Sequence, residues 1–388
     1  MSEALQATCL SLDEAISRWG TAWQELADNV GSATLFSRPA AVSAWDRHYR
    51  ARMTGSVLIA LDGSRLAGVL PLMRGRVWRG PAFAPRIDYA SEEASLMPSA
   101  FRPFPVRQVS PVVCWRASMV KPVLLCQPGD LDGVCHAMAL VLANMTGIDQ
   151  IILTAYEDDE ASAWISGLRE AGLSPFRHAL DRSVYTLETL RDLDSIIDEQ
   201  SANFRKNMRR SSARARKVGL TFSHFLGREE VIPQLDTLAD IADRSWKNTG
   251  SRETVVALKH DASQQAYLRD MISFDDPGLE PFLTLAHTGN TAIAAALWFR
   301  HGQTQSGLYI FRDETDRRLS TGLLTLAQGY GPALEAGLER IDLNATQDWV
   351  RYLADTNRMM SNVVAFRPTI AGRMYQAIAS RRGHLSRA

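Results

Sequence analysis

A short stretch of the sequence combines residue types that hold phosphates. The apolar segment GLYIF (307–311) is followed by two arginines, a Ser-Thr-Gly run and an apolar helical pattern; these polar residues are Arg317, Arg318, Ser320, Thr321 and Gly322. A helix N-terminus offers unpaired N–H groups and the positive end of its macrodipole to an anion. Serine and threonine are preferred N-caps, and arginines add charge-assisted hydrogen bonds. The stretch predicts a phosphate site, with an ordinary capped helix as the alternative.

Two residues are candidates for accepting a proton. Asp342 is the acid in the strand pattern IDLN, and a carboxylate among apolar neighbours is anomalous unless it has a function or a partner. Its alternative is an ion pair with an arginine such as Arg351 or Arg205. His287, in the apolar run LTLAH, is the second candidate, with an ordinary surface histidine as the alternative.

Positive charge is concentrated in SANFRKNMRRSSARARKVGL (201–220), where seven of the first nineteen residues are basic and none is acidic. At 100° per residue, one side of a helix collects the apolar residues and the other side the basic ones. The pattern predicts a single amphipathic helix that ends at Gly219 and packs through Phe204, Met208, Ala215 and Val218.

Three uses of this charge stay open: solvation, binding of a negative group on a donor, an acceptor or an acidic carrier protein, and binding of nucleic acid. The first turn carries Arg205, Lys206 and Arg209, which we take with Trp246 as the candidate substrate- or anion-binding residues. Nucleic acid is the least expected partner, because it needs a broad basic surface. Outside this helix the charges give no sign of one, since lysine plus arginine equals aspartate plus glutamate at 43 each.

The composition is that of an ordinary globular protein. With 388 residues, 46% of them hydrophobic, the chain is long enough for two domains. No apolar run is long enough to span a bilayer, and the first residues lack the pattern of a signal peptide, so we expect a cytoplasmic protein. The four cysteines lack metal-ligand spacing and are expected to be reduced, and no metal site is predicted.

The chain contains an internal repeat. Residues 56–73 and 282–299 are each two apolar runs joined by a turn, at Asp62-Gly63 and at Gly289-Asn290. A helical segment with a tryptophan precedes each hairpin, and a helix, a glycine and a short apolar strand follow it. In this last part GIDQIILTA (147–155) and GLERIDLNA (337–345) align without a gap. Three features recurring in one order predict a duplicated domain.

Each copy alternates helices, a hairpin, a further strand, a helix and a strand, which predicts an α/β fold, a mixed α+β sheet with helices on both faces. We place the domains at 1–190 and 191–388. Segment 74–128, rich in proline, arginine and aromatic residues, is predicted to be an elaborated loop. The first copy has LLCQPGD where the second has its arginines and Ser-Thr-Gly. The second copy is therefore expected to carry the ligand site, and the first to be degenerate, with a structural or acceptor-side role.

Together these features resemble the tandem-GNAT group of acyltransferases. The resemblance rests on FSRPAAVSAWDRHY (36–49), FRKNMRRSSARARKVG (204–219), SWKNTG (245–250) and YIFRDETDRRLSTGLLTLAQGYGPALEAGLERIDL (309–343). The group includes the CelD-like acetyltransferases of polysaccharide gene clusters and, more distantly, the FemAB-like aminoacyl transferases. Members often have an Asp-x-Gly-x-Gly type of turn where this chain has Asp342-Leu343-Asn344-Ala345-Thr346, so the choice of substrate is not carried over.

The resemblance implies two tandem GNAT-like domains that move an acyl group from acyl-CoA, or from an acyl carrier protein, to an amine. The amine belongs to a small molecule, an amino sugar or a peptide lying between the copies. The predicted phosphate residues then bind CoA, and Asp342 or His287 takes the proton. Tyr309 or Tyr352 hydrogen-bonds the thioester or protonates the thiolate. A FemAB-like aminoacyl-tRNA-dependent transferase, and a non-catalytic module that binds RNA or an acidic protein, are the alternatives.

Overall fold

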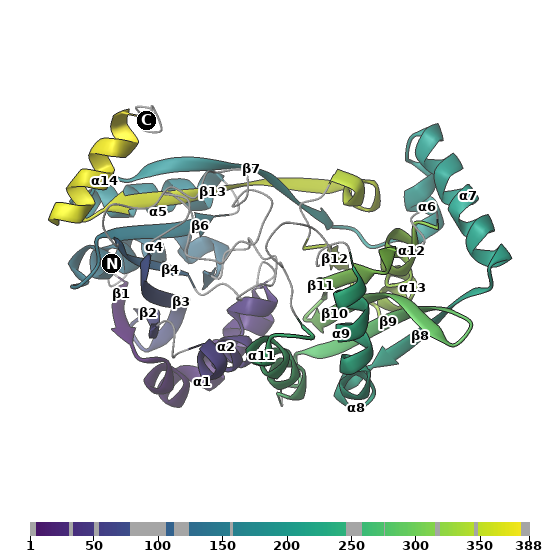
Figure 1. The fold of residues 1–388 in the computed structure, drawn as a ribbon. Helices are drawn as coiled ribbons and strands as arrows, with labels where there is room; N and C mark the ends of the chain where they lie inside the picture. Colours follow the sequence, from purple (N-terminus) through teal and green to yellow (C-terminus); the bar gives the residue numbers. More distant parts are fainter. Residues whose placement is uncertain are drawn as a thin grey trace. The chain divides into compact units, whose positions relative to one another are not determined.

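The computed structural model divides the chain into two compact units (Figure 1). Unit 1 contains the residues up to Arg182 and those from Met359 onward, and unit 2 contains Ser183–Arg358. The structure describes residues 5–30, 34–49, 54–77, 106–111, 124–155, 158–245, 258–274, 276–314, 319–344 and 348–381.

Unit 1 is a mixed sheet with helices packed on it. Its strands lie in the order β1-β2-β3-β4-β6-β13, and β4 and β6 are the parallel pair. The two-residue strand β5 pairs with β3. The bounds are β1 Gln6–Leu10, α1 Leu12–Asn29, α2 Pro39–Tyr49, β2 Thr54–Asp62, β3 Arg65–Val77, β4 Val106–Pro111, β5 Leu125–Cys126, α4 Leu131–Asn144, β6 Gln150–Ala155, α5 Asp158–Glu170, β7 Phe176–Leu187, β13 Thr356–Phe366 and α14 Ile370–Arg381.

Unit 2 repeats this order as β8-β9-β10-β11-β12-β7, and here β11 and β12 are the parallel pair. The agreement of the two orders is what the predicted repeat requires. The bounds are α6 Leu193–Asp198, α7 Ala202–Lys217, β8 Leu220–Leu226, α8 Gly227–Val231, α9 Leu235–Arg244, α11 Ala262–Ser273, β9 Glu280–Thr288, β10 Thr291–His301, β11 Thr304–Arg312, α12 Thr321–Ala327, α13 Tyr330–Glu335, β12 Arg340–Asp342 and the 3-10 helix η5 Asp348–Leu353.

Glycines mark the same points in both repeats. The two hairpin turns contain Gly63 and Gly289, with φ of 57° and 58°, in the left-handed region that glycine tolerates. Gly147 and Gly337, each before the strand that follows the helix, have φ of 74° and 70°. The first turn lies one residue later than predicted, because Asp62 is still paired with Arg65 in the hairpin.

The two units do not divide at one point of the chain. The last residues of β7 pair with β12, as in Leu187 with Ile341, and so complete the sheet of unit 2. The last residues of β13, from Ser361, pair with β6 and complete the sheet of unit 1. The C-terminal segment from Met359, which a division at residue 190 assigns to the second domain, therefore belongs to unit 1.

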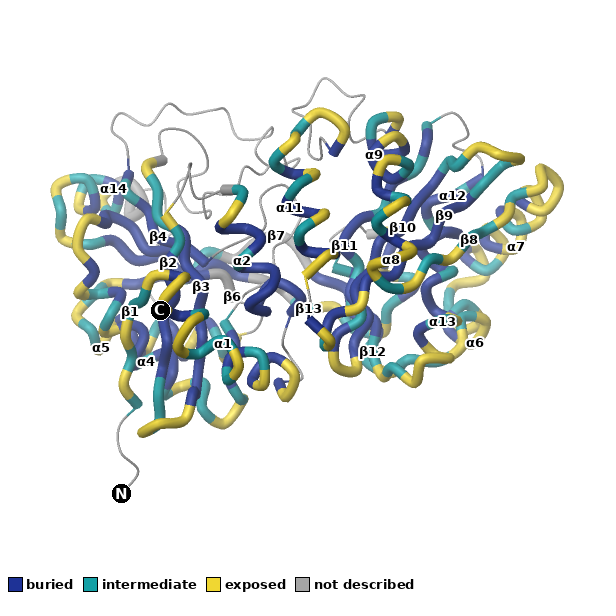
Figure 2. Tube along the Cα trace, turned by 90° about the horizontal axis from the view of Figure 1, so that it is seen from below, coloured by how far each residue is buried: buried dark blue, intermediate teal, exposed yellow. Residues whose placement is uncertain are grey.

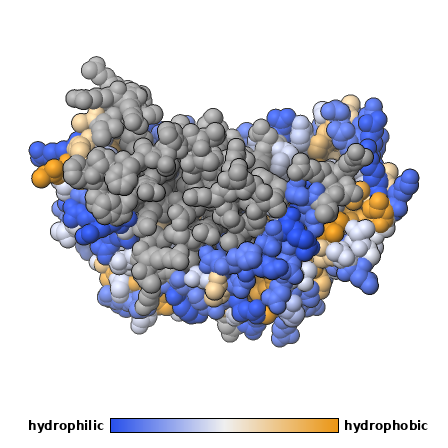
Figure 3. All heavy atoms as spheres, in the orientation of Figure 1, coloured by the Kyte–Doolittle hydropathy of each residue, from blue (hydrophilic) through white to orange (hydrophobic). Residues whose placement is uncertain are grey.

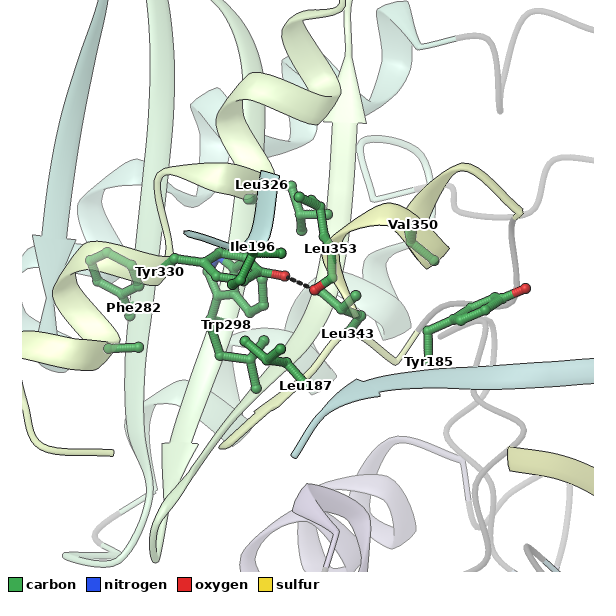
Figure 4. Close-up of a cluster of buried hydrophobic side chains, with 13 residues drawn as sticks. Tyr185, Leu187, Ile196, Phe282, Trp298, Leu326, Tyr330, Leu343, Val350 and Leu353 are labelled. Carbon is green, nitrogen blue, oxygen red and sulfur yellow. Dashed lines mark hydrogen bonds between the residues drawn. The ribbon is translucent and has the colours of Figure 1, made fainter. Parts of the chain in front are cut away.

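Helices cover both faces of the unit 2 sheet, as predicted. Successive residues of a strand point to opposite faces, and Leu297, Trp298 and Phe299 all have 0% exposure. On one face Trp298 packs with Tyr330 of α13 in a cluster of buried side chains (Figure 4). The Tyr330 hydroxyl donates to the carbonyl of Leu353 at 2.6 Å, and burial raises its pKa, so it stays a neutral donor. The strands of both units are largely buried, with exposed residues on helices and loops (Figure 2).

Part of the predicted loop 74–128 is instead strand. Val106–Pro111 forms β4 between β3 and β6, and Leu125–Cys126 forms β5. The hydrophobic pattern of this short sequence is irregular, but β4 is paired with a strand on each side. Its backbone hydrogen bonds to β3 and β6 do not depend on which side chains alternate along it. Residues 78–105 and 112–123 of the segment lie outside the described residues.

A buried carboxylate holds the C-terminal segment of unit 1. Asp149 accepts hydrogen bonds from Arg107 Nη2 at 2.7 Å and from Thr369 Oγ1 at 2.7 Å. Burial by itself raises the pKa of Asp149, but the hydrogen bonds from Arg107 and Thr369 outweigh it and lower the pKa to about 2. The folded state therefore favours the ionised form.

We expect Asp149→Asn to lower the free energy of unfolding by about 2 kcal/mol at neutral pH, since one pKa unit corresponds to about 1.4 kcal/mol. The folded pKa is the lower one, so the stabilisation is complete above about pH 4 and is lost as the pH falls toward 2. Denaturant titrations of both proteins from pH 7 to 3 measure the difference. Asp158→Asn is the control, because the Asp158 side chain is 90% exposed beside Arg177. An equal loss at both sites would contradict the prediction.

Candidate functional site

The parallel strands β11 and β12 of unit 2 separate after a short ladder. Their pairing runs from Thr304 with Arg340 to Ser306 with Asp342, while β11 continues to Arg312. Among the described residues, no strand pairs with β11 on this side beyond Ser306. Beyond Ser306, β11 therefore presents a strand edge, the kind of backbone that can bind an extended ligand by hydrogen bonds.

A turn after β12 ends the ladder. Asn344 has φ of 47°, its backbone N–H donates to Asp342 Oδ1 at 2.9 Å, and its side-chain amide donates to the carbonyl of Gly307 at 2.8 Å. A Cβ atom added to Gly307 would lie 3.0 Å from the carbonyl oxygen of Leu343. This approach is tighter than most Cβ contacts, so glycine suits the position, and the start of GLYIF is the sequence signal that marks it.

A bulge decides which way Tyr309 points. Trp298 of β10 is opposite Gly307, but its neighbour Leu297 is opposite Tyr309, so Leu308 is the extra residue. The register shift turns Tyr309 onto the face that carries Ser306 and its register partner Asp342. Tyr309 is buried and stacks on Phe311 with ring centroids 5.3 Å apart. The structure thus brings two predicted residues, Asp342 and Tyr309, to one face of adjacent strands.

Sequence analysis missed a second pair on this face. His301 Nε2 lies 2.8 Å from Ser306 Oγ, and both side chains are buried. Ser306 is the register partner of Asp342. Neither residue lies in a motif, and only strand register reveals their position.

His287 lies elsewhere in the sheet. It is on β9, opposite Ala292 of β10 and Thr221 of β8. Three strand spacings, about 14 Å, separate β9 from β12, so His287 and Asp342 do not form a pair. The Nε2 atom of His287 is buried and has no hydrogen-bond partner in the described part of the chain. It stays a candidate for a separate polar contact.

The predicted phosphate loop leads into α12. Ser320 is its N-cap residue, as predicted, but with φ of 54° and no capping bond from its side chain. The Ser320 hydroxyl instead accepts a hydrogen bond from Ser211 of α7 at 3.2 Å. Thr321 begins the helix and is buried. Arg317 and Arg318 lie outside the described residues.

Arg312 is a cation at this loop that the sequence did not single out. A Cβ atom on Gly322 would lie 3.3 Å from Arg312 Cδ, so the arginine stem packs on the first turn of α12. Arg312 Nη2 is 3.2 Å from Glu314 Oε1. The signal was available, since an arginine at the end of a strand just before a phosphate loop is well placed for an anion.

The corresponding helix start in unit 1 is acidic. Asp130 is the N-cap residue of α4 and forms an ion pair with Arg65 at 2.9 Å, and Asp132 follows in the first turn. Carboxylates at a helix N-terminus oppose the binding of a phosphate. A phosphate site is thus disfavoured in unit 1.

Helix α7 has the predicted amphipathic form, from Ala202 to Lys217, and Gly219 beyond its end has φ of 68°. Phe204, Met208 and Ala215 are buried, whereas Val218 is 42% exposed. Placing Val218 in the buried face was wrong, because the helix has ended before it. The buried Phe204 ring stacks on Tyr352 with centroids 4.3 Å apart.

The candidate anion-binding residues of α7 have different surroundings. Arg205 Nη1 donates to the carbonyls of Asp198 and Gln200, at 2.9 and 2.6 Å, and so caps α6. Lys206 and Arg209 are exposed. Arg351, the other proposed partner of Asp342, donates to the Tyr352 hydroxyl at 2.8 Å. Trp246 lies outside the described residues.

The described residues contain neither a metal-binding cluster nor a membrane-spanning helix. No group of three or more histidine, cysteine, aspartate or glutamate side chains there is arranged to hold a metal ion. None of the described helices has the length and apolar character needed to cross a membrane.

The family model described as an acetyltransferase (GNAT) domain matches residues 202–352, from the start of α7 to η5. These residues form a GNAT acetyltransferase domain. The match contains the β11–β12 separation and the loop into α12, so the GNAT domain coincides with the candidate site of unit 2. No curated protein sequence matches the chain.

Three solved structures are similar over the whole chain. FemX aligns with a TM-score of 0.57 at 12% identity, covering 96% of this chain and 99% of that one. The C-terminal domain of a putative lysylphosphatidylglycerol synthetase from Agrobacterium fabrum has a TM-score of 0.53 at 12% identity, covering 96% and 97%. A tandem GNAT protein from the clavulanic acid biosynthesis pathway has a TM-score of 0.49 at 12% identity, covering 94% and 99%. At these identities the likeness concerns the fold.

Proposed function

We propose that the protein is an N-acyltransferase that moves an acyl group from acyl-CoA to an amine of a small molecule, an amino sugar or a peptide. The separation of β11 from β12 after Ser306 and Asp342, inside the GNAT domain, carries this proposal. Beyond this point no described strand pairs with β11 on that side, and Asp342 and Tyr309 share a face there. The CelD-like group is the part of the family that we favour, and the cytoplasm is the compartment that suits a CoA thioester.

The donor fits the loop between β11 and α12. The Ser320 side chain forms no capping bond, so the first N–H groups of α12 remain for phosphate oxygens. Arg312 packs beside this turn, and Arg317 and Arg318 precede it in the sequence. Because Gly322 has no side chain, a phosphate can approach the backbone of this turn closely. Unit 1, with Asp130 and Asp132 at the equivalent helix start, is assigned a structural or acceptor-side role.

Acyl transfer from a thioester to an amine depends mainly on how the protein positions the two reactants. The acceptor amine, with an ordinary pKa near 10, must lose a proton before or during attack on the thioester carbonyl. Asp342 takes this proton directly or through one water, and a backbone N–H of β11 beyond its pairing with β12 holds the oxyanion. The C–S bond then breaks, the C–N bond remains, and the CoA thiolate takes a proton, for which Tyr309 or Tyr352 is the candidate donor.

Calorimetry tests the donor site. We expect acetyl-CoA to bind saturably to the wild type and at least tenfold more weakly to Arg318→Ala/Ser320→Ala, because a charge-assisted hydrogen bond contributes roughly 1.5–3 kcal/mol. Gln127→Ala, in the corresponding loop of unit 1, is the control and should leave the affinity unchanged. Unaltered binding by the double variant would remove this loop from the donor site.

A FemAB-like aminoacyl-tRNA-dependent transferase is the second candidate. The whole-chain likeness to the FemX fold and the exposed cations of α7 favour it. Such an enzyme would bind tRNA with a salt dependence equivalent to several phosphates, without acyl-CoA turnover. A non-catalytic module would bind RNA or an acidic protein and turn over neither donor.

A further inference from the structure

Five cations of α7 form a stripe that the proposed reaction does not use. Within the described chain, no hydrogen bond or ion pair involves the side chains of Lys206, Arg209, Arg210, Arg216 and Lys217. At 100° per residue these five, the basic stripe, fall within about 120° of arc and span about 17 Å of the helix. The remaining basic residues flank the stripe and are engaged: Arg205 caps α6, and Arg214 also interacts with a neighbouring group.

The opposite face of α7 holds the helix against the donor loop. Phe204, Met208 and Ala215 pack with Leu324 of α12, and Ser211 donates to Ser320 at the start of α12. The basic stripe therefore points away from α12 while α7 itself borders the donor loop. In Figure 3, hydrophilic side chains alternate with some hydrophobic ones on the part of unit 2 where Figure 1 draws α7.

Acidic residues lie beside the N-terminal end of the stripe. Asp194, Asp198 and Glu199 are exposed on and beside α6, which precedes α7. Since all five cations lie on α7 and within about 120° of arc, the stripe is narrow. An extended polyanion such as RNA, or a flat anionic membrane, would meet these carboxylates as well as the cations.

We propose that the basic stripe docks an acidic helix of a carrier protein that presents the acyl group on a phosphopantetheine arm. The inference rests on the proposed function, since it names the protein that carries the thioester to the same donor loop. A stripe of about 17 Å matches roughly three turns of a partner helix, and its charge complements acidic side chains. The arm passes α7 to reach the loop into α12. The carrier's C–S bond breaks, the amide forms, and the carrier keeps its sulfur as a thiol.

The test uses the full chain with acetyl-loaded bacterial acyl carrier protein as the probe. We expect Arg210→Glu/Arg216→Glu/Lys217→Glu to weaken carrier binding at least tenfold, and raising NaCl from about 50 to 300 mM to weaken the wild type but not the variant. Turnover with acetyl-CoA should be the same in both proteins. The matched control is Arg169→Glu/Arg269→Glu/Arg373→Glu, on three exposed helical arginines outside α7.

The outcomes are distinct. Carrier binding that survives the stripe variant, or is equally lost in the control, overturns the proposal. Binding of tRNA or of phosphatidylglycerol vesicles that is tighter than carrier binding and is lost in the stripe variant also overturns it. Absence of acetyl-CoA turnover in every protein counts against the proposed function alone, because carrier binding is measured without turnover.

Discussion

Asp342→Asn is expected to lower kcat by roughly 10²- to 10⁴-fold, the range that a positioned general base contributes, while acetyl-CoA binds as before. The carboxylate lies at the end of β12, on the face that Tyr309 shares. Asparagine keeps an oxygen that can accept the Asn344 N–H, now 2.9 Å from Asp342 Oδ1, so the turn should survive. Steady-state kinetics with acetyl-CoA and an amine acceptor, together with calorimetry, measure the two effects.

A matched control separates chemistry from structure. Asp276 Oδ1 accepts the N–H of Gly278 at 2.9 Å, the same local bond two residues along the chain. We expect Asp276→Asn to keep its turnover. The dependence of kcat on pH is a second measurement. If Asp342 is the base, the fall of kcat at acidic pH should be absent in the Asp342→Asn variant. Equal turnover of Asp342→Asn and wild type would exclude Asp342 from the mechanism and return attention to His287.

Gly307→Ala is expected to damage the site through the backbone. Its Cβ atom would lie 3.0 Å from the Leu343 carbonyl oxygen and 3.5 Å from Trp298, both in packed surroundings, so β11 and β12 must move apart. Overpacking of this kind costs about 1–3 kcal/mol of stability. A shift of a few tenths of an ångström at Leu343 would also move the neighbouring Asp342, so turnover is expected to fall. Thermal unfolding and kcat are the measurements.

Gly331→Ala is the counterpart on α13. No atom lies within 4 Å of a Cβ at Gly331, and alanine is the better helix former. This variant should keep full turnover and gain up to about 1 kcal/mol of stability. If both variants behaved alike, the close approach of Gly307 to Leu343 would have no role in the site.

Local patterns predicted much of this molecule. The two hairpins, the helix α7 and the glycines Gly147 and Gly337 follow from short-range periodicity and from the backbone freedom of glycine. Residue preferences of helix starts predicted Ser320 or Thr321 as the N-cap of α12, and Ser320 holds that position without a capping bond from its side chain. The repeat then predicted that both halves share one fold, and the two strand orders agree.

Other features had no local signal. The strand β4 was taken for loop, because its neighbours β3 and β6 come from distant parts of the chain. Strand β7 begins in unit 1 and its last residues complete the sheet of unit 2, whereas β13 begins in unit 2 and its last residues complete the sheet of unit 1. Pairing between such distant strands has no signal in the sequence of either strand. Val218 was placed in the buried face of α7 by extending a helix that ends at Lys217.

The sequence by itself therefore determined the repeated α/β elements, the acyltransferase family resemblance of the second half, and the residues to examine. Only the tertiary structure decided which of them meet. A bulge at Leu308 turns Tyr309 toward the face of Asp342, three strand spacings keep His287 away, and Ser211 ties the basic helix to Ser320. These outcomes depend on strand register and packing between distant segments, and a one-residue change in register reverses the face of a side chain.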